Sequence, residues 1–273
     1  MTDKERSMNM RNKIMVTVGI LIILAGIICG GIGIKSYLDE KNAGKDYEKI
    51  KSEITIATPE PTPVQEETEE IQEPEPTKEP LVIPVDLEGL IEKYPDVYAW
   101  IRIPGTDIDY PILQKEGDNS YYLNHTVEGK KKIEGAIFTE DYNTKDFTDP
   151  NTVIYGHNMK NGSMFRQLHK YEDRSFFQDN REVLIYQTDQ ILHYQIFAAY
   201  TYDDRHLMLS FDFNDPNVFE GYIGFIMDLK GMSNNIDDSV DITGEDKIIT
   251  LSTCNGNSSQ RYIVQAVLLS IDN

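Results

Sequence analysis

Residues 247–270 read KIITLSTCNGNSSQRYIVQAVLLS, and this stretch decides the fold. Two runs rich in apolar and β-branched residues, 247–254 and 261–269, are joined by only the six residues NGNSSQ. Strands separated by so short a linker are expected to pair as a hairpin. Cys254 ends the first strand and Arg261 begins the second, so we expect the hairpin to bring thiol and guanidinium together at one rim of a sheet.

Further strand patterns lie upstream of this hairpin, each bounded by turn-forming residues. Segment 100–114 has alternating apolar residues and is broken by Pro104-Gly105 and by Pro111. The other strand segments are 135–142, 151–158, 182–187 and 192–202. At least seven strands with few long helices predict a mainly β domain, either a closed barrel or a sandwich.

Three short helices are expected among these strands, at 86–94, 163–171 and 215–230. In the last of them one face carries four apolar residues, namely Phe219, Tyr222, Ile223 and Ile226. The simpler interpretation is that this face packs on the sheet. A ligand-contacting role for the same face stays open.

The N-terminal part of the chain predicts a membrane anchor followed by a spacer. Residues 14–34 carry no charge over 21 positions, long enough for a transmembrane helix. Basic residues cluster before this run, which favours a cytoplasmic location for residues 1–13. A cleaved signal peptide is the competing interpretation. Residues 35–85 are expected to form an extracellular linker. Its first part, residues 35–57, is mixed and charged and could form a frayed helix, and from residue 59 it is rich in Pro and Glu and therefore extended. Residues 86–273 are left as the folded domain.

Charge and cysteine content exclude several functions. From residue 81 onward the chain has 16 Lys and Arg against 31 Asp and Glu, a net charge of −15. Nucleic acid is therefore not expected as a partner, because like charges would meet. Cys29 lies inside the apolar run, so Cys254 is the only thiol of the folded domain. Neither a disulfide framework nor a cysteine-rich metal site is expected there.

Cys254 and Arg261 could serve acyl transfer, since a neighbouring cation favours the thiolate and can hold the oxygen of a tetrahedral intermediate. A structural alternative is that Cys254 is a small buried apolar residue and Arg261 is solvated. A catalytic thiol also needs a proton carrier. Among the histidines, His157 alone follows directly from a strand end, after Gly156 and within a loop that carries Asn158 and Asn161.

These motifs together resemble the sortases, the transpeptidases that attach surface proteins to the Gram-positive cell wall. TLSTC followed by Arg261, with YGHN upstream, is similar to the family signature. WIRIPGTDIDYPILQ, NSYYLNH, GAIF and YGHNMKNGSMFRQL resemble the class B branch, and the likeness spans about residues 86–269. The resemblance implies a closed eight-stranded barrel with a few short helices, an N-terminal membrane anchor, and an active site of His157, Cys254 and Arg261.

The resemblance also implies a substrate groove. It would be lined by Asn119 and Leu123 of NSYYLNH, by Ser252 of TLSTC, and by Tyr222 and Ile223 on the helix before the Cys254 strand. Several class B enzymes carry an acidic residue soon after the cysteine, whereas residues 255–260 contain none, so no role is assigned there. No spaced set of calcium ligands is evident, and neither a metal nor a cofactor is expected.

As a sortase, the chain would be a single-pass protein of the cell membrane with its catalytic domain outside. It would cleave the sorting signal of secreted proteins through a thioacyl intermediate and transfer the acyl group to a cell-wall precursor amine. Three alternatives remain open: a pilin lysine as the acceptor, a plain cysteine peptidase, and a non-catalytic binding module on a stalk.

Overall fold

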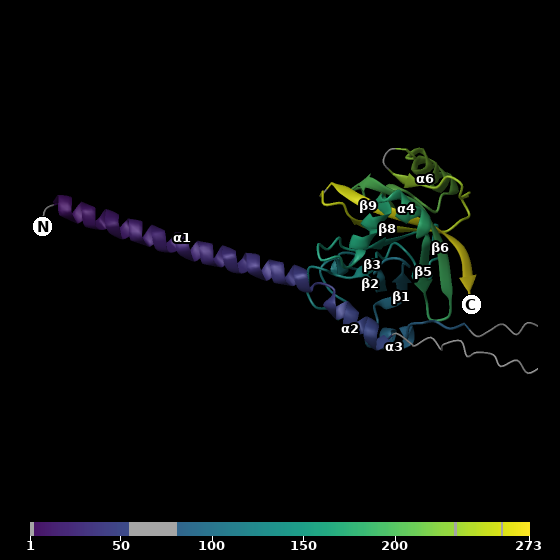
Figure 1. Ribbon diagram of the computed structural model, residues 1–273, viewed down its shortest axis with the longest axis horizontal. Helices are drawn as coiled ribbons and strands as arrows, with labels where there is room; N and C mark the ends of the chain where they lie inside the picture. The colour runs from purple at the N-terminus through teal and green to yellow at the C-terminus, as the bar shows by residue number, and fades with distance from the viewer. Residues whose placement is uncertain (1–2, 55–80, 232–233, 258) are drawn as a thin grey trace, which may run out of the picture. The chain divides into compact units, whose positions relative to one another are not determined.

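The computed structural model describes residues 3–54, 81–231, 234–257 and 259–273 (Figure 1). The chain divides into two compact units, one ending at Asn42 and the other spanning Ala43–Asn273. Most of the segment predicted to be a Pro/Glu-rich linker lies outside the described residues.

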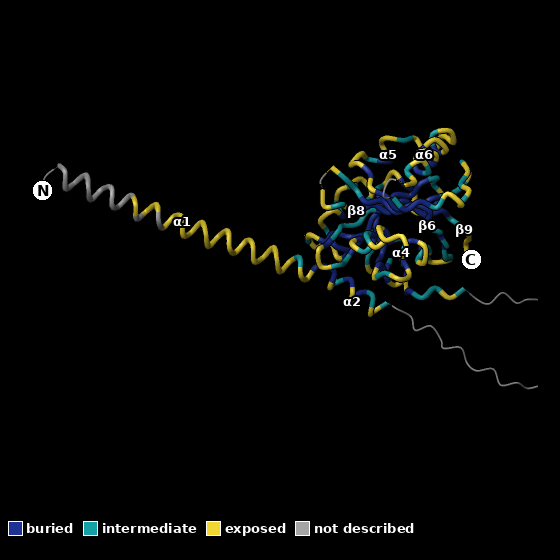
Figure 2. Tube along the Cα trace, turned by 45° about the horizontal axis from the view of Figure 1, so that its top comes forward, coloured by how far each residue is buried: buried dark blue, intermediate teal, exposed yellow. Residues whose placement is uncertain are grey.

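The first unit is the single helix α1 (Asp3–Asn42), which contains the predicted anchor 14–34. Its described apolar side chains, such as Ile22, Leu24 and Ile28, are exposed, as the yellow tube of Figure 2 shows. In length and composition this helix can cross a membrane, and a signal sequence would meet the same criteria. The helix predicted at 14–34 is therefore present within a longer one.

The second unit contains every strand predicted from the sequence. Its helices and strands, in chain order, are α2 (Lys45–Ile54), α3 (Leu87–Lys93), β1 (Val97–Arg102), β2 (Asp109–Gln114), η1 (Tyr121–Leu123), β3 (Ile137–Thr139), β4 (Asn151–Tyr155), η2 (Phe165–Glu172), α4 (Arg174–Asp179), β5 (Glu182–Tyr186), β6 (Ile191–Asp203), α5 (Leu207–Ser210), α6 (Pro216–Asp228), β7 (Asn235–Ile236), β8 (Ile248–Cys254) and β9 (Gln260–Asp272). The helix expected at 163–171 is the 3₁₀ helix η2.

Eight strands close into a mixed barrel. Their order is β5-β1-β2-β3-β4-β8-β9-β6, and β5 pairs with both β1 and β6, which closes the ring. β2–β3 and β4–β8 are the parallel pairs, whereas the other pairs are antiparallel. The two-residue strand β7 adds to β6 outside the ring. The closed eight-stranded barrel implied by the sequence is confirmed.

Two apolar clusters fill the unit. The larger one lies within the barrel and against α2 and α3, and the smaller one lies between the sheet and α6. The four residues predicted to share a face of α6 are all buried in the smaller cluster. The packing interpretation of this face is therefore confirmed. Figures 1 and 2 place α6 and α2 at opposite ends of the unit.

Helix α2 differs from the expectation that residues 35–85 form a linker outside the folded domain. Tyr47 and Ile50 are buried in the larger cluster, and the Tyr47 hydroxyl donates to the Gly135 carbonyl oxygen at 2.7 Å. The Lys132 ammonium meets Asp46 at 2.6 Å. The folded unit thus begins near Ala43, because one apolar face of a charged segment is enough to dock it.

Candidate active site

Cys254 and Arg261 face each other across the β8–β9 hairpin. The antiparallel register pairs Cys254 with Arg261 and Thr253 with Tyr262. Cys254 is exposed at the end of its strand, and Arg261 is half-buried. The hairpin predicted from residues 247–270 is therefore confirmed. The alternative in which Cys254 is a buried apolar residue does not hold.

His157 reaches the same rim from the neighbouring strand. β4 runs parallel to β8 with Tyr155 opposite Ser252, and the Gly156 nitrogen donates to the Ser252 carbonyl oxygen at 3.1 Å. A Cβ atom at Gly156 would lie 2.5 Å from Ile137 Cδ1 and 2.6 Å from Phe165 Cγ. Only glycine fits so close an approach, so it lets β4 end tightly against the barrel and present the next residue.

The imidazole of His157 is held by one of its two nitrogens. Nε2 lies 2.7 Å from the Leu123 carbonyl oxygen. Because a carbonyl oxygen only accepts, Nε2 carries the hydrogen of this bond. A neutral His157 therefore has its lone pair on Nδ1, and Nδ1 is the nitrogen that can take a proton.

One small pocket of about 100 Å³ is lined by all three predicted catalytic residues. Leu123, Ser252 and Thr253 share its wall. An adjoining cavity of about 190 Å³ also includes Arg261, Leu123 and Ser252 and extends to Asn119. Six of the eight predicted site residues thus line two connected cavities.

Tyr222 and Ile223 do not line either of these cavities. They are 2% and 5% exposed and belong to the cluster beneath α6. The Tyr222 hydroxyl accepts from Gln265 Nε2 at 2.9 Å, and burial raises the pKa of Tyr222 to about 12. The structure does not bring these two side chains to the catalytic pocket, because helix α6 turns them into the core.

Residues of the β6–α5 connection take part in the adjoining cavity instead. Asp204, Arg205 and His206 lie in its wall, together with Tyr202 near the end of β6. His206 Nε2 pairs with Glu140 at 2.7 Å. Sequence analysis did not identify this segment, because its polar residues show no periodicity from which their position on the barrel could be predicted.

A hydrogen-bond network behind the nucleophile was also missed. Asn158 Nδ2 donates to the Cys254 carbonyl oxygen at 2.7 Å and lies 3.0 Å from His169 Nε2. His169 Nδ1 in turn lies 2.6 Å from Glu172, and its ring stacks on Tyr262 with centroids 4.8 Å apart. With the hydrogen on Nδ1 donated to the carboxylate, Nε2 can accept from Asn158, whose Nδ2 then donates both to Nε2 and to the Cys254 carbonyl oxygen.

The remaining histidines lie in other settings. His193 is paired with Asp272 and Glu182 at 3.1 and 3.6 Å. His125 stacks on Tyr121 with centroids 4.1 Å apart. His157 is therefore the histidine that lines the pocket of the thiol.

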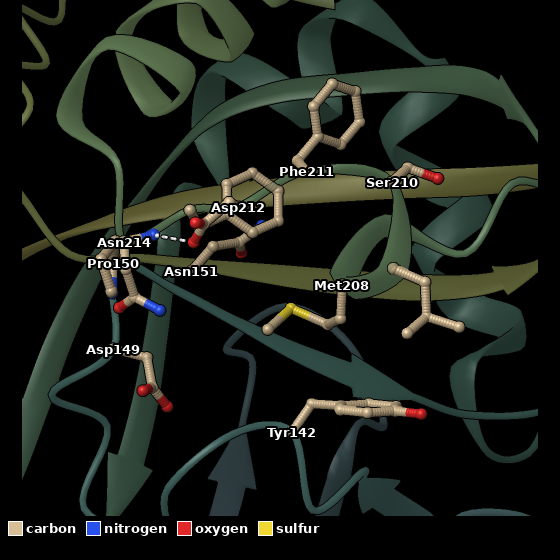
Figure 3. Close-up of a pocket in the computed structure, with 11 residues that line it drawn as sticks. Tyr142, Asp149, Pro150, Asn151, Met208, Ser210, Phe211, Asp212 and Asn214 are labelled. Carbon is tan, nitrogen blue, oxygen red and sulfur yellow. Dashed lines mark hydrogen bonds between the residues drawn. The ribbon is translucent and has the colours of Figure 1, made fainter.

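A larger cavity of about 390 Å³ lies between the 142–151 segment and residues 208–214 (Figure 3). Tyr142, Met208 and Phe211 supply its apolar wall, and Asp149 and Asp212 its charges. None of the predicted site residues lines it. Within the described residues, no group of three or more His, Cys, Asp or Glu side chains gathers closely enough to hold a metal ion.

Chemically, the rim joins a nucleophile, a proton carrier and a fixed cation around one opening. A thiolate can attack a carbonyl carbon there, a guanidinium can hold the oxyanion, and an imidazole can move the proton. These are the requirements of acyl transfer through cysteine.

Comparison with known proteins identifies the family of this chain. The Sortase domain family matches residues 101–269. A sortase B of Listeria monocytogenes is 36% identical over 188 residues, which is 68% of this chain and 74% of that protein. The crystal structure of Clostridium perfringens sortase B has 30% identity and a TM-score of 0.61. The match covers 67% of this chain and 99% of that chain. The crystal structure of a Streptococcus pyogenes class B sortase involved in pilus biogenesis has 30% identity and a TM-score of 0.58. The match covers 68% of this chain and 98% of that chain.

Proposed function

Because this chain belongs to the sortase family, with class B enzymes as its relatives, we propose that it cleaves a C-terminal sorting signal on secreted proteins and joins the product to a cell-wall amine. The family makes it a transpeptidase. The substrates and the covalent route are proposed here on the geometry of the site. The observation that carries it is the pocket shared by Cys254, His157 and Arg261.

In the first half-reaction the Cys254 thiolate attacks the carbonyl carbon of a threonine in the sorting signal. The carbon–sulfur bond forms, and the negative charge moves to the carbonyl oxygen, where the Arg261 guanidinium stabilises it. His157 protonates the leaving amine as the peptide bond breaks. The thioester of Cys254 and the departing C-terminal peptide are the products.

In the second half-reaction a primary amine attacks the thioester. His157 takes a proton from this amine through Nδ1, since Nε2 is engaged with the Leu123 carbonyl. Collapse of the tetrahedral intermediate expels the Cys254 thiolate and leaves a new amide bond. The acceptor we propose is an amine on the peptide of a cell-wall precursor.

The sorting signal would lie along the two connected cavities. Asn119, Leu123 and Ser252 line them and are proposed to contact the peptide. Tyr222 and Ile223 are omitted from this groove because they are buried under α6.

We further propose that the chain is a single-pass membrane protein with residues 1–13 in the cytoplasm and the barrel outside. The length and composition of α1 support this topology. Extracellular placement also matches the proposed substrates, which are secreted proteins and cell-wall precursors.

The nucleophile is tested by comparing Cys254→Ala with Cys29→Ala in the full chain held in detergent micelles. Incubation with a library of candidate sorting peptides and amine acceptors is followed by mass spectrometry of the products. Cys254→Ala should abolish both cleavage and transfer, whereas Cys29→Ala should keep both. Turnover by the Cys254→Ala protein would remove the nucleophile assignment.

A pilin lysine is the second candidate acceptor, because a similar class B sortase takes part in pilus biogenesis. The same assay separates the acceptors when a lysine-bearing peptide competes with a cell-wall stem peptide. Preferential transfer to the lysine would favour polymerisation of fibres. Release of free acid in abundant amine would identify a plain peptidase.

A further inference from the structure

The chain between the predicted anchor and the folded unit is short. The apolar run ends at Ile34, and residues 35–42 complete helix α1. At a rise of about 1.5 Å per residue, residues 35–42 span about 12 Å. Ala43 follows directly and already belongs to the folded unit. Chain length alone therefore keeps Ala43 within roughly 16 Å of the end of the apolar run.

Segment 55–80 does not add to this distance. It lies outside the described residues, but the residues on either side of it meet, because the Asp86 nitrogen donates to the Ile54 carbonyl oxygen at 3.0 Å. Ile50 before the segment and Leu87 after it are buried in the larger apolar cluster. The chain thus leaves the folded unit at Ile54 and returns to it at the same place. As an extended spacer, the same segment would span up to about 80 Å, at about 3.1 Å per residue.

The first residues of the folded unit contact the loop that carries His157. Asn161 Nδ2 donates to the Ala43 carbonyl oxygen at 2.8 Å. A Cβ atom at Gly44 would lie 2.9 Å from Ser163 Cβ, so only glycine allows this approach. Asn161 follows His157 by four positions, a reach of at most about 14 Å. The residue that joins the anchor to the folded unit is therefore bonded to the loop of the proposed proton carrier.

Helix α2 fixes this junction on the barrel. Tyr47 is buried and packs edge-on against Tyr110, with ring centroids 5.6 Å apart. The Tyr110 hydroxyl in turn accepts from the nitrogen of Met164, which lies in the same loop as Asn161, at 3.0 Å. The Lys51 ammonium meets the buried Asp109 carboxylate at 2.8 Å. These buried contacts hold the junction beside the catalytic loop.

We propose that residues 35–44 hold the catalytic loop at a short, constant height above the bilayer, and that segment 55–80 is not a spacer. The pocket then serves peptide substrates that are held in the same membrane at that height. This inference rests on the proposed function and on the proposed membrane topology. Tethering an enzyme and its substrate to one surface raises their effective concentration only where the tethers let the two meet.

The test places a helical insert of four EAAAK repeats at one of two positions in the full chain, which is reconstituted in lipid vesicles. Between Asn42 and Ala43 the insert adds about 30 Å of helix between the anchor and the barrel. Between Glu69 and Glu70 the same insert is the matched control. The contact of Ile54 with Asp86 closes that segment whatever its length, so this insert should not change the height.

Energy transfer measures the height without any turnover. With Cys29→Ala in every protein, a fluorophore on the exposed Cys254 transfers energy to acceptor lipids in the vesicle. We expect the insert after Asn42 to lower the transfer and the insert after Glu69 to leave it unchanged. Replacing residues 56–79 by a short Gly-Ser linker is a further variant and should also leave it unchanged. A change with either alteration of segment 55–80, or no change with the insert after Asn42, would overturn the proposal.

Turnover gives the second measurement, with one sorting peptide from the library in two forms. The free peptide should be cleaved alike by the unchanged chain and both insert variants, which also shows that each is folded. The same peptide on a palmitoyl chain in the vesicle should be cleaved at least about tenfold more slowly after insertion at Asn42 alone. Lengthening the stem of this lipopeptide by about 30 Å, the length of the insert, should restore the rate.

The two forms of the peptide separate this inference from the proposed function. If the unchanged chain did not cleave the free peptide, the proposed function would fail, and energy transfer would still decide the height. Cleavage of the lipopeptide at the same rate with and without the insert after Asn42 would overturn this inference alone.

Discussion

The Asn158 side chain donates a hydrogen bond of 2.7 Å to the carbonyl oxygen of Cys254, and these residues are 96 positions apart in the sequence. Asn158 directly follows His157, so one hydrogen bond ties the loop of the proposed proton carrier to the strand end of the proposed nucleophile. The Arg166 guanidinium fixes the other end of the same amide by donating to Asn158 Oδ1 at 3.0 Å. The amide therefore sets the spacing of the two catalytic segments.

Asn158→Ala should lower kcat/KM about tenfold or somewhat more, because a single hydrogen bond that positions reacting groups contributes roughly 1–2 kcal/mol. The change should fall on kcat, since Asn158 does not line the pocket. Steady-state kinetics on a sorting peptide measure it. Asn217→Ala, at an exposed position on α6, is the matched control and should leave kcat unchanged. A selective rise in KM would contradict the positioning role.

His157→Ala should reduce turnover by about 10²–10⁴-fold, the usual contribution of a positioned acid or base. His193→Ala is the comparison, because His193 is tied to Asp272 and Glu182 away from the pocket. That variant should lose activity only to the extent that it unfolds. Circular dichroism checks the fold of both proteins. Equal losses in two folded variants would be incompatible with His157 as the proton carrier.

The pocket shared by the three proposed catalytic residues could be predicted from the sequence because each sits at the end of a readable strand. The β8–β9 register follows from a six-residue linker, and Gly156 marks the end of β4. Asn158 could be recognised only as part of an amide-rich loop. Its partner, the Cys254 carbonyl, carries no signal in the sequence, since every residue has one.

Helix α2 shows a second limit of prediction from the sequence. Residues 45–54 read as charged linker with few apolar positions, and the side chains that bind them come from residues 109 and 132. Such long-range pairing leaves no local pattern. Conversely, the apolar face of α6 was recognised correctly, but the resemblance assigned Tyr222 and Ile223 to the groove, whereas burial assigns them to the core.

Tyr47→Ala should destabilise the folded unit by about 3 kcal/mol, because it removes a large buried side chain from the larger apolar cluster. It should also lower kcat, because Tyr47 supports the segment whose Leu123 carbonyl oxygen contacts His157. The Tyr47 hydroxyl donates to the Gly135 carbonyl oxygen, and the Ala136 nitrogen in turn donates to the Tyr122 carbonyl oxygen at 3.0 Å, one residue before Leu123. Urea unfolding of the full chain measures the stability.

Two companion variants separate these effects. Tyr47→Phe keeps the ring and loses only the hydroxyl, so its cost should be about 1–2 kcal/mol. Tyr142→Ala, at a half-exposed ring, should cost less than either. If Tyr47→Ala unfolded at the same urea concentration as the unchanged chain, α2 would not be part of the folded unit.

High pH should unfold the barrel, because burial raises the pKa of several tyrosines. It raises the pKa of Tyr110 to about 12, and the pKa of Tyr98 and Tyr194 is also raised. An unfolded tyrosine ionises near pH 10. Each raised group therefore stabilises the fold fully below about pH 10, and this stability is lost as pH rises through the folded pKa. The free energy of unfolding should fall steeply between about pH 10 and pH 12.

Urea unfolding at a series of alkaline pH values measures this slope, and ultraviolet absorbance reports phenolate formation in parallel. Each buried tyrosine contributes at most about 1.4 kcal/mol per pH unit, so Tyr110→Phe should make the decline shallower by up to that amount. Tyr142→Phe, at a half-exposed position, should leave the slope unchanged. Ionisation of Tyr110 near pH 10 with the fold intact would contradict this prediction, because water would then reach the Tyr110 ring. The ring of Tyr47, whose centroid lies 5.6 Å from that of Tyr110, would in that case not pack tightly against it.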